Sequence, residues 1–227
     1  MSLDETTTPA TRPAESRVRA SYDAVATEYG AALEHELDGK PLDRALLAAL
    51  VEMSGDGTIA DLGCGPGHVT RHLAGLRTDV VGIDISPRMI EIAREAAPGV
   101  RFEVASMIDL PVEDGAWSGA ALLYSIIHLR ETQRMQAFSE LRRALAPGGV
   151  ALISFHIRSE EHPPGDFAHL DQWFEQDVDL DRYFLDPEQV IAEVSTAGFD
   201  LVSVTTRLPN SSERPTERAY LLVRKPA

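Results

Sequence analysis

Apolar and polar positions follow two alternating patterns from about residue 57 onward. Short apolar runs predict buried strands, and apolar residues that recur every three or four positions predict amphipathic helices between them. Runs of the first kind predict strands at 59–61, 79–84, 100–105, 117–124 and 150–155. Regular alternation of strand and helix is typical of a mainly parallel, doubly wound α/β sheet.

Two further apolar runs, 199–205 and 218–224, follow the last predicted helix. The polar loop between them is too short for a parallel crossover, which takes about a dozen or more residues and is usually helical, so we expect an antiparallel pair. At 227 residues the chain is long enough for one α/β domain with a sizeable core. We therefore expect a single domain over 16–227, after a disordered tail at 1–15 that is rich in Thr, Pro, Glu and Ser.

Two regions of the expected domain lie outside the alternating pattern. Residues 16–54 predict two helices ahead of the first strand, which we expect to form an N-terminal helical cap. Residues 157–185 form a longer insert between the fifth predicted strand and the next helix. Long inserts usually lie where ligands bind, at the carboxyl ends of the strands, although this one could also be a plain surface connection.

Three glycines at alternate positions, Gly63, Gly65 and Gly67, follow the first predicted strand and its acid, Asp61. Glycine tolerates positive φ and lets the backbone approach a ligand without a Cβ in the way. A helix begins directly afterwards, and its N-terminus offers unpaired N–H groups. The dinucleotide fingerprint G-x-G-x-x-G needs its third glycine one position later, where this chain has His68. The turn indicates a ligand site, although purely structural turns also collect glycine.

The second predicted strand ends in an acid, Asp84, which is followed by Ile85 and a helix that contains Met89. A carboxylate at this position of a nucleotide-binding sheet accepts hydrogen bonds from the ribose hydroxyls. The alternative is that Asp84 caps the following helix, for which Ser86 is already a suitable residue. The correctly spaced glycine turn before it favours the ribose role.

These motifs, in this order, resemble those of class I S-adenosylmethionine-dependent methyltransferases that act on small molecules. The glycine turn, Asp84, Ser106-Met107 after the third strand and the Leu-Ala-Pro-Gly-Gly-Val run at 145–150 carry the resemblance, which extends over nearly all of 20–225. It implies a Rossmann-like fold of three layers with a seven-stranded sheet, mainly parallel, that ends in an antiparallel hairpin. It also implies S-adenosyl-L-methionine as the cofactor and S-adenosyl-L-homocysteine as the product.

The same resemblance implies which residues bind the cofactor. Ser106 and Met107 would hold the adenine, and Tyr22 and Tyr29 on the first helix would close over the methionine end, with amphipathic packing of that helix as the alternative. The expected cofactor-binding residues are Tyr22, Tyr29, Asp61, Gly63, Cys64, Gly65, Gly67, Asp84, Ile85, Met89, Ser106, Met107, Tyr124 and Ser125.

The expected reaction is an in-line displacement in which a nucleophilic atom of a small-molecule acceptor takes the methyl group. The protein mainly has to align the reactants and exclude water, and an oxygen or nitrogen acceptor must also lose a proton. The candidate bases are His128, just past the fourth strand, and His156, just past the fifth, each with a structural role as the alternative. In such enzymes the insert at 157–185 covers the acceptor, and its aromatic residues favour an apolar or aromatic one. Carbon acceptors remain open.

The formal net charge of −15 opposes binding to nucleic acid, because such a surface repels phosphate backbones. No apolar run approaches the roughly eighteen residues of a membrane span, and no signal-peptide pattern begins the chain. We therefore expect a cytoplasmic protein with no membrane partner, either a monomer or a homodimer. The single cysteine, Cys64, leaves no internal disulfide.

No metal site is expected. The histidines of the insert match no compact ligand motif. Asp177, Asp179, Asp181 and Glu188 have the spacing of a calcium loop, but Arg182 stands where that loop needs glycine. Two alternatives to methyl transfer remain. One is a non-catalytic S-adenosylmethionine-binding protein, and the other is an NAD-dependent oxidoreductase, which the glycine spacing and the terminal hairpin oppose.

Overall fold

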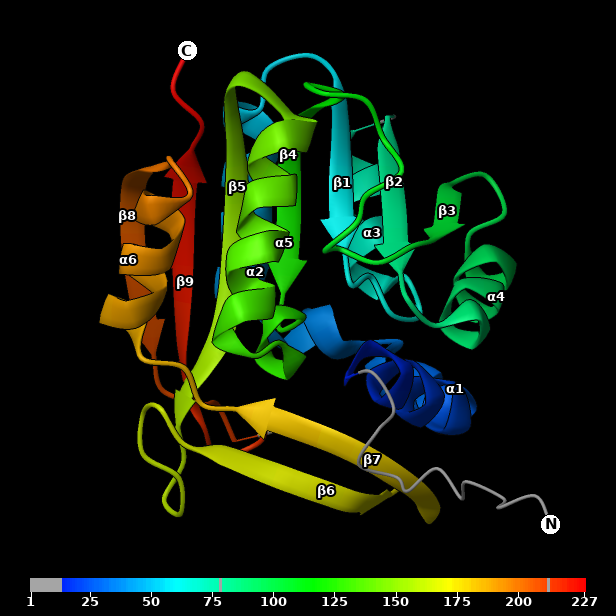
Figure 1. Ribbon diagram of the computed structural model, residues 1–227. Coiled ribbons are helices and arrows are strands. Elements are labelled where there is room, and N and C mark those ends of the chain that lie inside the picture. The colour runs from blue at the N-terminus through cyan, green and yellow to red at the C-terminus, as the bar shows by residue number, and fades with distance from the viewer. Residues whose placement is uncertain (1–13, 78, 212) are drawn as a thin grey trace, which may run out of the picture.

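A single seven-stranded sheet forms the centre of the protein in a computed structural model that describes residues 14–77, 79–211 and 213–227. The strand order is β3-β2-β1-β4-β5-β9-β8, and the first five pair in parallel. β9 runs antiparallel to both β5 and β8 (Figure 1). The predicted mainly parallel sheet with its antiparallel C-terminal hairpin is confirmed. The strands are β1 (Thr58–Leu62), β2 (Val80–Asp84), β3 (Arg101–Val104), β4 (Trp117–Leu123), β5 (Leu145–Arg158), β8 (Asp200–Arg207) and β9 (Glu217–Arg224).

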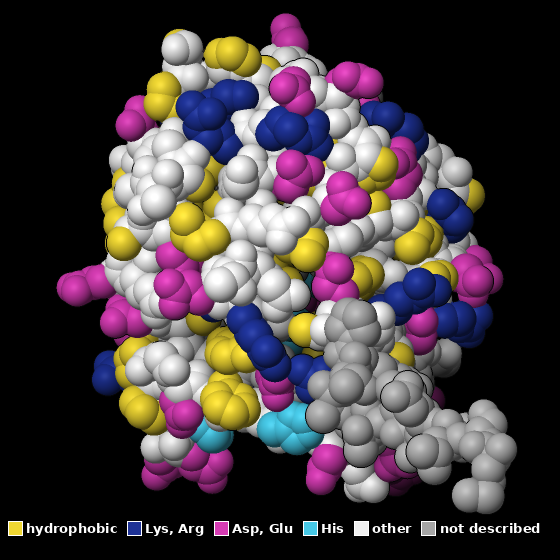
Figure 2. All heavy atoms as spheres, viewed as in Figure 1, with side chains coloured by type: hydrophobic (Ala, Val, Ile, Leu, Met, Phe, Trp, Pro, Cys, Tyr) yellow, Lys and Arg dark blue, Asp and Glu magenta, His cyan; other side chains and the backbone are white. Residues whose placement is uncertain are grey.

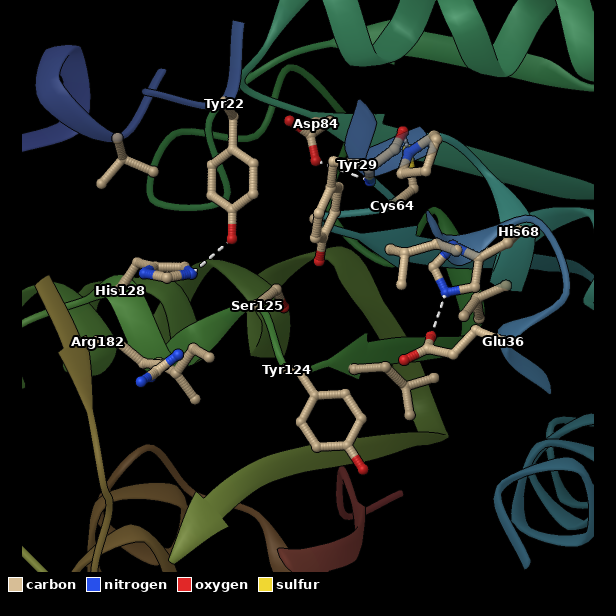
Figure 3. Close-up of a pocket in the computed structure, with 18 of the residues that line it drawn as sticks. Tyr22, Tyr29, Glu36, Cys64, His68, Asp84, Tyr124, Ser125, His128 and Arg182 are labelled. Atoms are coloured by element: carbon tan, nitrogen blue, oxygen red, sulfur yellow. Dashed lines mark hydrogen bonds and ion pairs between the residues drawn. The ribbon is translucent and has the colours of Figure 1, made fainter. Parts of the chain in front are cut away.

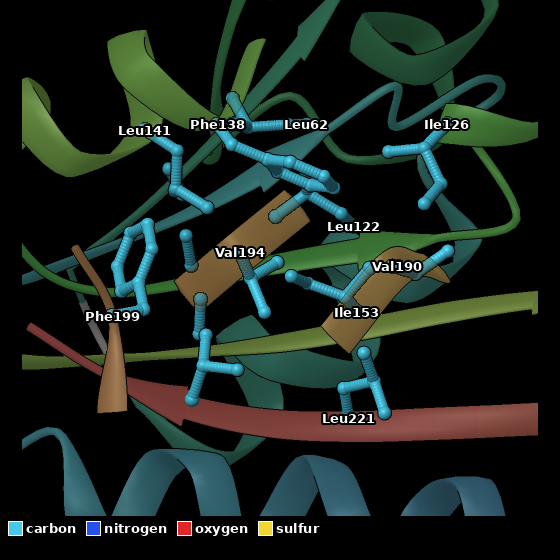
Figure 4. Close-up of a cluster of buried hydrophobic side chains, with 14 of the residues drawn as sticks. Leu62, Leu122, Ile126, Phe138, Leu141, Ile153, Val190, Val194, Phe199 and Leu221 are labelled. Carbon is cyan, nitrogen blue, oxygen red and sulfur yellow. The ribbon is translucent and has the colours of Figure 1, made fainter. Parts of the chain in front are cut away.

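Helices cover both faces of this sheet and complete the three layers. α5 (Glu131–Ala144) and α6 (Pro187–Thr196) lie on one face, where Phe138 and Val194 belong to the larger apolar cluster (Figure 4). α2 (Pro41–Met53) and α3 (His68–Leu76) lie on the other face, where Leu47 and Leu73 pack in a second cluster. Successive side chains of a buried strand point to opposite faces of the sheet. In β5, Leu152 packs in the second cluster and Ile153 in the first. α4 (Pro87–Ala96) packs beside the edge strand β3.

The insert between β5 and α6 contains a hairpin that the sequence did not predict. β6 (Phe167–Trp173) and β7 (Gln176–Tyr183) pair antiparallel as a separate two-stranded sheet. Its turn consists of Phe174 and Glu175, both with positive φ, so no glycine marks it in the sequence. The acidic positions with calcium-loop spacing lie mostly along β7, which is a strand and not a loop.

α1 (Ala14–Leu33) begins inside the region predicted as a tail, and residues 1–13 of that region lie outside the described part of the chain. The helix is tied to the hairpin by polar contacts. Arg17 Nη1 lies 2.8 Å from Asp179 Oδ1, and Ser21 Oγ accepts a hydrogen bond from the Asp179 amide at 2.9 Å. Figure 1 shows α1 and the β6–β7 hairpin together beyond the carboxyl ends of the parallel strands. A short 3₁₀-helix, η2 (Glu36–Gly39), connects α1 to α2.

Acidic and basic side chains are interspersed over the face shown in Figure 2, despite the net charge of −15. Within the described ranges, no helix is both long and apolar enough to cross a membrane.

Candidate functional site

A cavity of about 560 Å³ opens at the carboxyl ends of the central strands, beneath α1 and the hairpin (Figure 3). Its wall combines the glycine turn after β1, the end of β2, and the segment after β4. In an open parallel sheet this edge, at the point where the strand order reverses, is where ligands bind. Here the strand order reverses between β1 and β4. β2 and β3 follow on the side of β1, and β5 follows on the side of β4.

The three glycines of the turn all adopt positive φ, at +74°, +52° and +80°. A Cβ at Gly63 would lie 2.3 Å from the Cβ of Ser125, and one at Gly67 would lie 2.9 Å from the Cβ of Ala93. A Cβ at Gly65 would meet only a ring carbon of Tyr29, at 3.9 Å. The outer two glycines are therefore required by close packing inside the protein, whereas the middle one presents open backbone to the cavity.

Asp84 lies beside this turn with its carboxylate fixed by two backbone amides. Its Oδ2 accepts from the Gly65 amide and its Oδ1 from the Ser86 amide, both at 2.8 Å. Ser86 caps α4, since its Oγ accepts from the Met89 amide at 3.1 Å. The cap is thus supplied by Ser86, and each Asp84 oxygen keeps a lone pair for a ligand. Burial raises the pKa of Asp84 to about 6.

Three of the expected cofactor-binding residues, Asp61, Gly67 and Met89, do not line the cavity. The Asp61 carboxylate is buried beneath α3 and accepts from Thr70 Oγ1 at 2.6 Å. Met89 is fully buried because it lies on the inner face of α4, and Gly67 packs against that helix. The others do line it: Tyr22, Tyr29, Gly63, Cys64, Gly65, Asp84, Ile85, Ser106, Met107, Tyr124 and Ser125.

Because Asp61 is buried, its titration affects stability. Burial is the largest cause that raises the pKa of Asp61, to about 6, although its bond from Thr70 opposes the shift. An unfolded Asp titrates near about 3.9, so the folded state holds an extra proton between these values. The stabilisation that results is fully present below the unfolded pKa and is lost as the pH rises through the folded one.

Asp61→Asn removes this titration while keeping an acceptor for Thr70. Between about pH 5 and pH 7.5 the wild type is expected to lose about 1 kcal/mol more unfolding free energy than the variant. Urea unfolding at the two pH values measures the difference. Asp200→Asn, on the exposed start of β8, is the control and is expected to behave like the wild type. Equal pH dependence in Asp61→Asn and the wild type would contradict the assignment.

Tyr124 directly follows β4 and has a positive φ of 56°, an uncommon conformation for a non-glycine residue. Its hydroxyl lies 2.7 Å from that of Tyr220, which donates to Asp43 Oδ1 at 3.0 Å. The ring stacks on His156, with centroids 5.0 Å apart. Among the described residues, the buried hydroxyl of the next residue, Ser125, has no hydrogen-bond partner. Tyr220 and His156 therefore hold the strained residue after β4 in place. Ser125, in contrast, leaves an unsatisfied hydroxyl on the cavity wall.

His128, on the 3₁₀-helix η3 (Ile126–His128), is bonded at both ring nitrogens. Nδ1 lies 2.8 Å from the carbonyl oxygen of Asp181, which can only accept, so Nδ1 carries the proton. Nε2 therefore accepts from the Tyr22 hydroxyl, at 2.7 Å. Burial lowers the pKa of His128 to about 4, so the ring is neutral at physiological pH.

His156, the second candidate base, also lines the cavity. Its Nδ1 lies 2.8 Å from Thr216 Oγ1. Burial, followed by the charges of Arg218 and Arg182, lowers the pKa of His156 well below its usual value. Both candidate histidines thus reach the same cavity as neutral rings.

Several charged residues of the cavity wall carry no signal in the sequence. Glu36 accepts from Lys40 at 2.7 Å and from His68 at 2.9 Å. Burial alone would raise the pKa of Glu36, but these hydrogen bonds outweigh it and lower the pKa to about 2. Arg182 reaches the wall from β7, Arg214 from the β8–β9 loop, and Arg218 from the start of β9. They come from separate segments, so only the fold brings them together.

Comparison with known proteins agrees with this architecture. Residues 59–149 match the family described as a methyltransferase domain. The chain is 30% identical over 182 residues to the O-methyltransferase cnsE of Penicillium expansum, covering 75% of this chain and 61% of that protein. This chain covers only 48% to 61% of the length of the first curated relatives.

Solved structures share the fold at lower sequence identity. The 1,6-didemethyltoxoflavin-N1-methyltransferase of Burkholderia thailandensis, with bound S-adenosylhomocysteine, superposes with a TM-score of 0.70 at 17% identity, covering 100% of this chain and 99% of that one. The [4+2]-cyclase SpnF superposes with a TM-score of 0.68 at 20% identity, covering 95% and 98%. The family match, the glycine turn and the strand order together show that residues 59–149 form a methyltransferase domain, and the chain as a whole resembles the class I S-adenosylmethionine-dependent methyltransferases.

Proposed function

We propose that this protein transfers a methyl group from S-adenosylmethionine to an oxygen or nitrogen atom of a small molecule. The observation that carries the proposal is the Asp84 carboxylate, held by the Gly65 amide at the edge of a cavity where the strand order reverses. A carboxylate so fixed suits a ribose, because it can accept from two neighbouring hydroxyls. The named methyltransferases among the relatives support the same activity.

The residues present fit the cofactor. Asp84 would hold the ribose, and Ser106 and Met107 would hold the adenine. The open backbone at Gly65 and the unsatisfied hydroxyl of Ser125 would meet the methionine portion. When bound, S-adenosylmethionine supplies a methyl group already activated on a sulfonium sulfur, so the protein needs no group of its own to activate the donor.

The chain's own residues would then align the acceptor, exclude water and accept a proton. α1 and the β6–β7 hairpin cover the cavity, which removes water from the reacting atoms. His128 is the first candidate base, and its Nε2 is occupied by the Tyr22 hydroxyl. A proton from the acceptor would therefore pass to the oxygen of Tyr22 as that hydroxyl gives its own proton to His128 Nε2. His156 is the second candidate.

Asp84→Asn tests the cofactor site. The amide keeps the shape of the side chain but loses an acceptor oxygen, so the affinity for S-adenosylhomocysteine is expected to fall by about 10- to 100-fold, or about 1–3 kcal/mol. Calorimetric titration measures it. Asp79→Asn, on the exposed residue just before the opposite end of β2, is the matched control and should bind as the wild type does. Undiminished affinity in a folded Asp84→Asn protein would contradict the ribose role.

The rival functions differ in simple measurements. A nicotinamide oxidoreductase would be stabilised against heat by NADH and not by S-adenosylhomocysteine, which would overturn the proposal. A non-catalytic binding protein would bind S-adenosylhomocysteine but transfer no labelled methyl group to any acceptor in a broad panel. The shared fold of the cyclase SpnF is a reason to run both tests.

A further inference from the structure

Four cationic side chains line the cavity: Lys40, Arg182, Arg214 and Arg218. Two of them have acidic partners. Lys40 Nζ lies 2.7 Å from Glu36 and 3.5 Å from Glu213, and Arg218 lies 3.7 Å from Glu213. For Arg182 and Arg214, no carboxylate of the described residues lies within ion-pair distance. The cavity wall therefore has an excess of positive charge at these two arginines.

Arg182 is the better defined of the two. It projects from β7, its guanidinium lies 5.6 Å from the ring centroid of Phe184, and its buried Nε has no hydrogen-bond partner among the described residues. Burial, followed by the charge of Arg214, lowers the pKa of Arg182 to about 10, which still leaves it protonated. A half-buried cation whose buried Nε–H has no partner is costly unless a ligand supplies one.

Five acids also line the cavity, and none of them forms an ion pair with Arg182 or Arg214. Glu15 accepts from the Ser106 hydroxyl, and Asp84 accepts from the Gly65 and Ser86 amides. Glu36 and Glu213 are already paired with Lys40, and Asp43 is paired with Arg207. The neighbouring histidines are neutral. Because the net charge of the whole chain is −15, this local excess of positive charge runs against the general character of the protein. An anionic ligand would satisfy it.

Arg182 lies on the side of the cavity that holds the candidate bases, away from the proposed ribose site at Asp84. Figure 3 shows Asp84 and Arg182 well apart, with Tyr22 and His128 between them in this view. The Arg182 charge acts on Tyr22, His128 and His156. An anion bound to Arg182 would therefore lie next to the candidate bases.

We propose that the methyl acceptor carries an anionic group, a carboxylate or a phosphate, that binds Arg182 and Arg214. This inference rests on the proposed function. A guanidinium meets either group with two parallel hydrogen bonds, which a neutral amide or alcohol cannot match. Leu170, Trp173 and Leu180 of the hairpin supply apolar contacts for the remainder of the molecule.

The test follows the Nε–H signal of Arg182 by NMR in the S-adenosylhomocysteine complex. This signal is identified as the one missing from Arg182→Gln. Acetate and inorganic phosphate are expected to shift it at constant ionic strength, and neutral acetamide is not. Benzoate and phenyl phosphate, each compared with benzamide by calorimetry, distinguish the two sources of negative charge. Arg182→Gln is expected to weaken anion binding by about tenfold or more, and Arg182→Lys by less.

The exposed Arg224 at the end of β9 provides the matched control, since Arg224→Gln removes the same charge outside the cavity. If S-adenosylhomocysteine binds but no anion shifts the Arg182 signal, the inference is wrong and the proposed function stands. If S-adenosylhomocysteine itself shifts the signal and anions add nothing, the arginine serves the cofactor and the inference is also wrong. If S-adenosylhomocysteine does not bind at all, the proposed function fails, whatever the anions do.

Discussion

Glu193→Ala is expected to lower the free energy of unfolding by about 3–5 kcal/mol. Glu193 on α6 meets Arg134 on α5 in a bidentate pair, with Nη2–Oε1 at 2.5 Å and Nε–Oε2 at 2.9 Å. The two side chains are only 6% and 3% exposed, and Arg134 also donates to the Leu129 carbonyl at 3.0 Å. Removing the carboxylate leaves a guanidinium buried without its counter-charge, which costs far more than the pair itself contributes.

Urea unfolding measures this loss, with Glu91→Ala as the control. Glu91 forms an ion pair with Arg88 on the exposed surface of α4, so its removal is expected to change stability by less than about 0.5 kcal/mol. Replacing both members of the buried pair, with Arg134→Met and Glu193→Leu, should restore much of the loss because no charge remains buried. A loss below about 1 kcal/mol in Glu193→Ala would mean that water reaches the guanidinium.

Gly63→Ala is expected to destabilise the protein by about 2–5 kcal/mol, as the sum of a left-handed backbone and a steric clash. The residue has a φ of +74°, and the new methyl group would lie 2.3 Å from the Cβ of Ser125. Relief of the clash must displace the turn after β1 or the segment after β4, and both line the cavity. Binding of S-adenosylhomocysteine should therefore weaken together with stability.

Gly65→Ala separates the two causes. Gly65 shares the positive φ, but its Cβ would have open space, so a cost of only about 1–2 kcal/mol is expected. Adding Ser125→Gly to Gly63→Ala removes the clashing atom and should recover part of the stability. Thermal unfolding and cofactor titration report on each variant. If Gly63→Ala and Gly65→Ala were equally stable, the contact with Ser125 would have no energetic role.

The sheet was predictable because each of its strands and turns is marked by residues that lie close together in the sequence. Each buried strand is a short apolar run, and the positive φ of the turn is recorded directly as glycine at 63, 65 and 67. The position of Asp84 followed from the end of a strand in the same way. The sequence did not show that Asp61 and Met89 are buried away from the cavity, because a strand end or a helix start has two sides and only packing decides which side faces the cavity.

The rest of the site depends on contacts between distant segments. The β6–β7 hairpin turns through Phe174 and Glu175, residues that do not signal a turn. The bond from Tyr22 to His128 joins residues 106 positions apart. In the sequence, Arg182 drew attention only because it stands where a calcium loop needs glycine. It lines the cavity because β7 packs against α1, and the sequence did not predict that contact.

The two hydrogen bonds of His128 have a mechanical consequence. One ring nitrogen is bonded to Tyr22 of α1 and the other to Asp181 of β7, while His128 itself belongs to the segment after β4. Arg17 and Ser21 join α1 to β7 separately, so we expect these two elements to move together. An opening that moved both elements away from His128 would break both bonds of the imidazole at once. The proton affinity of this ring is thereby linked to whether the cavity is open or closed.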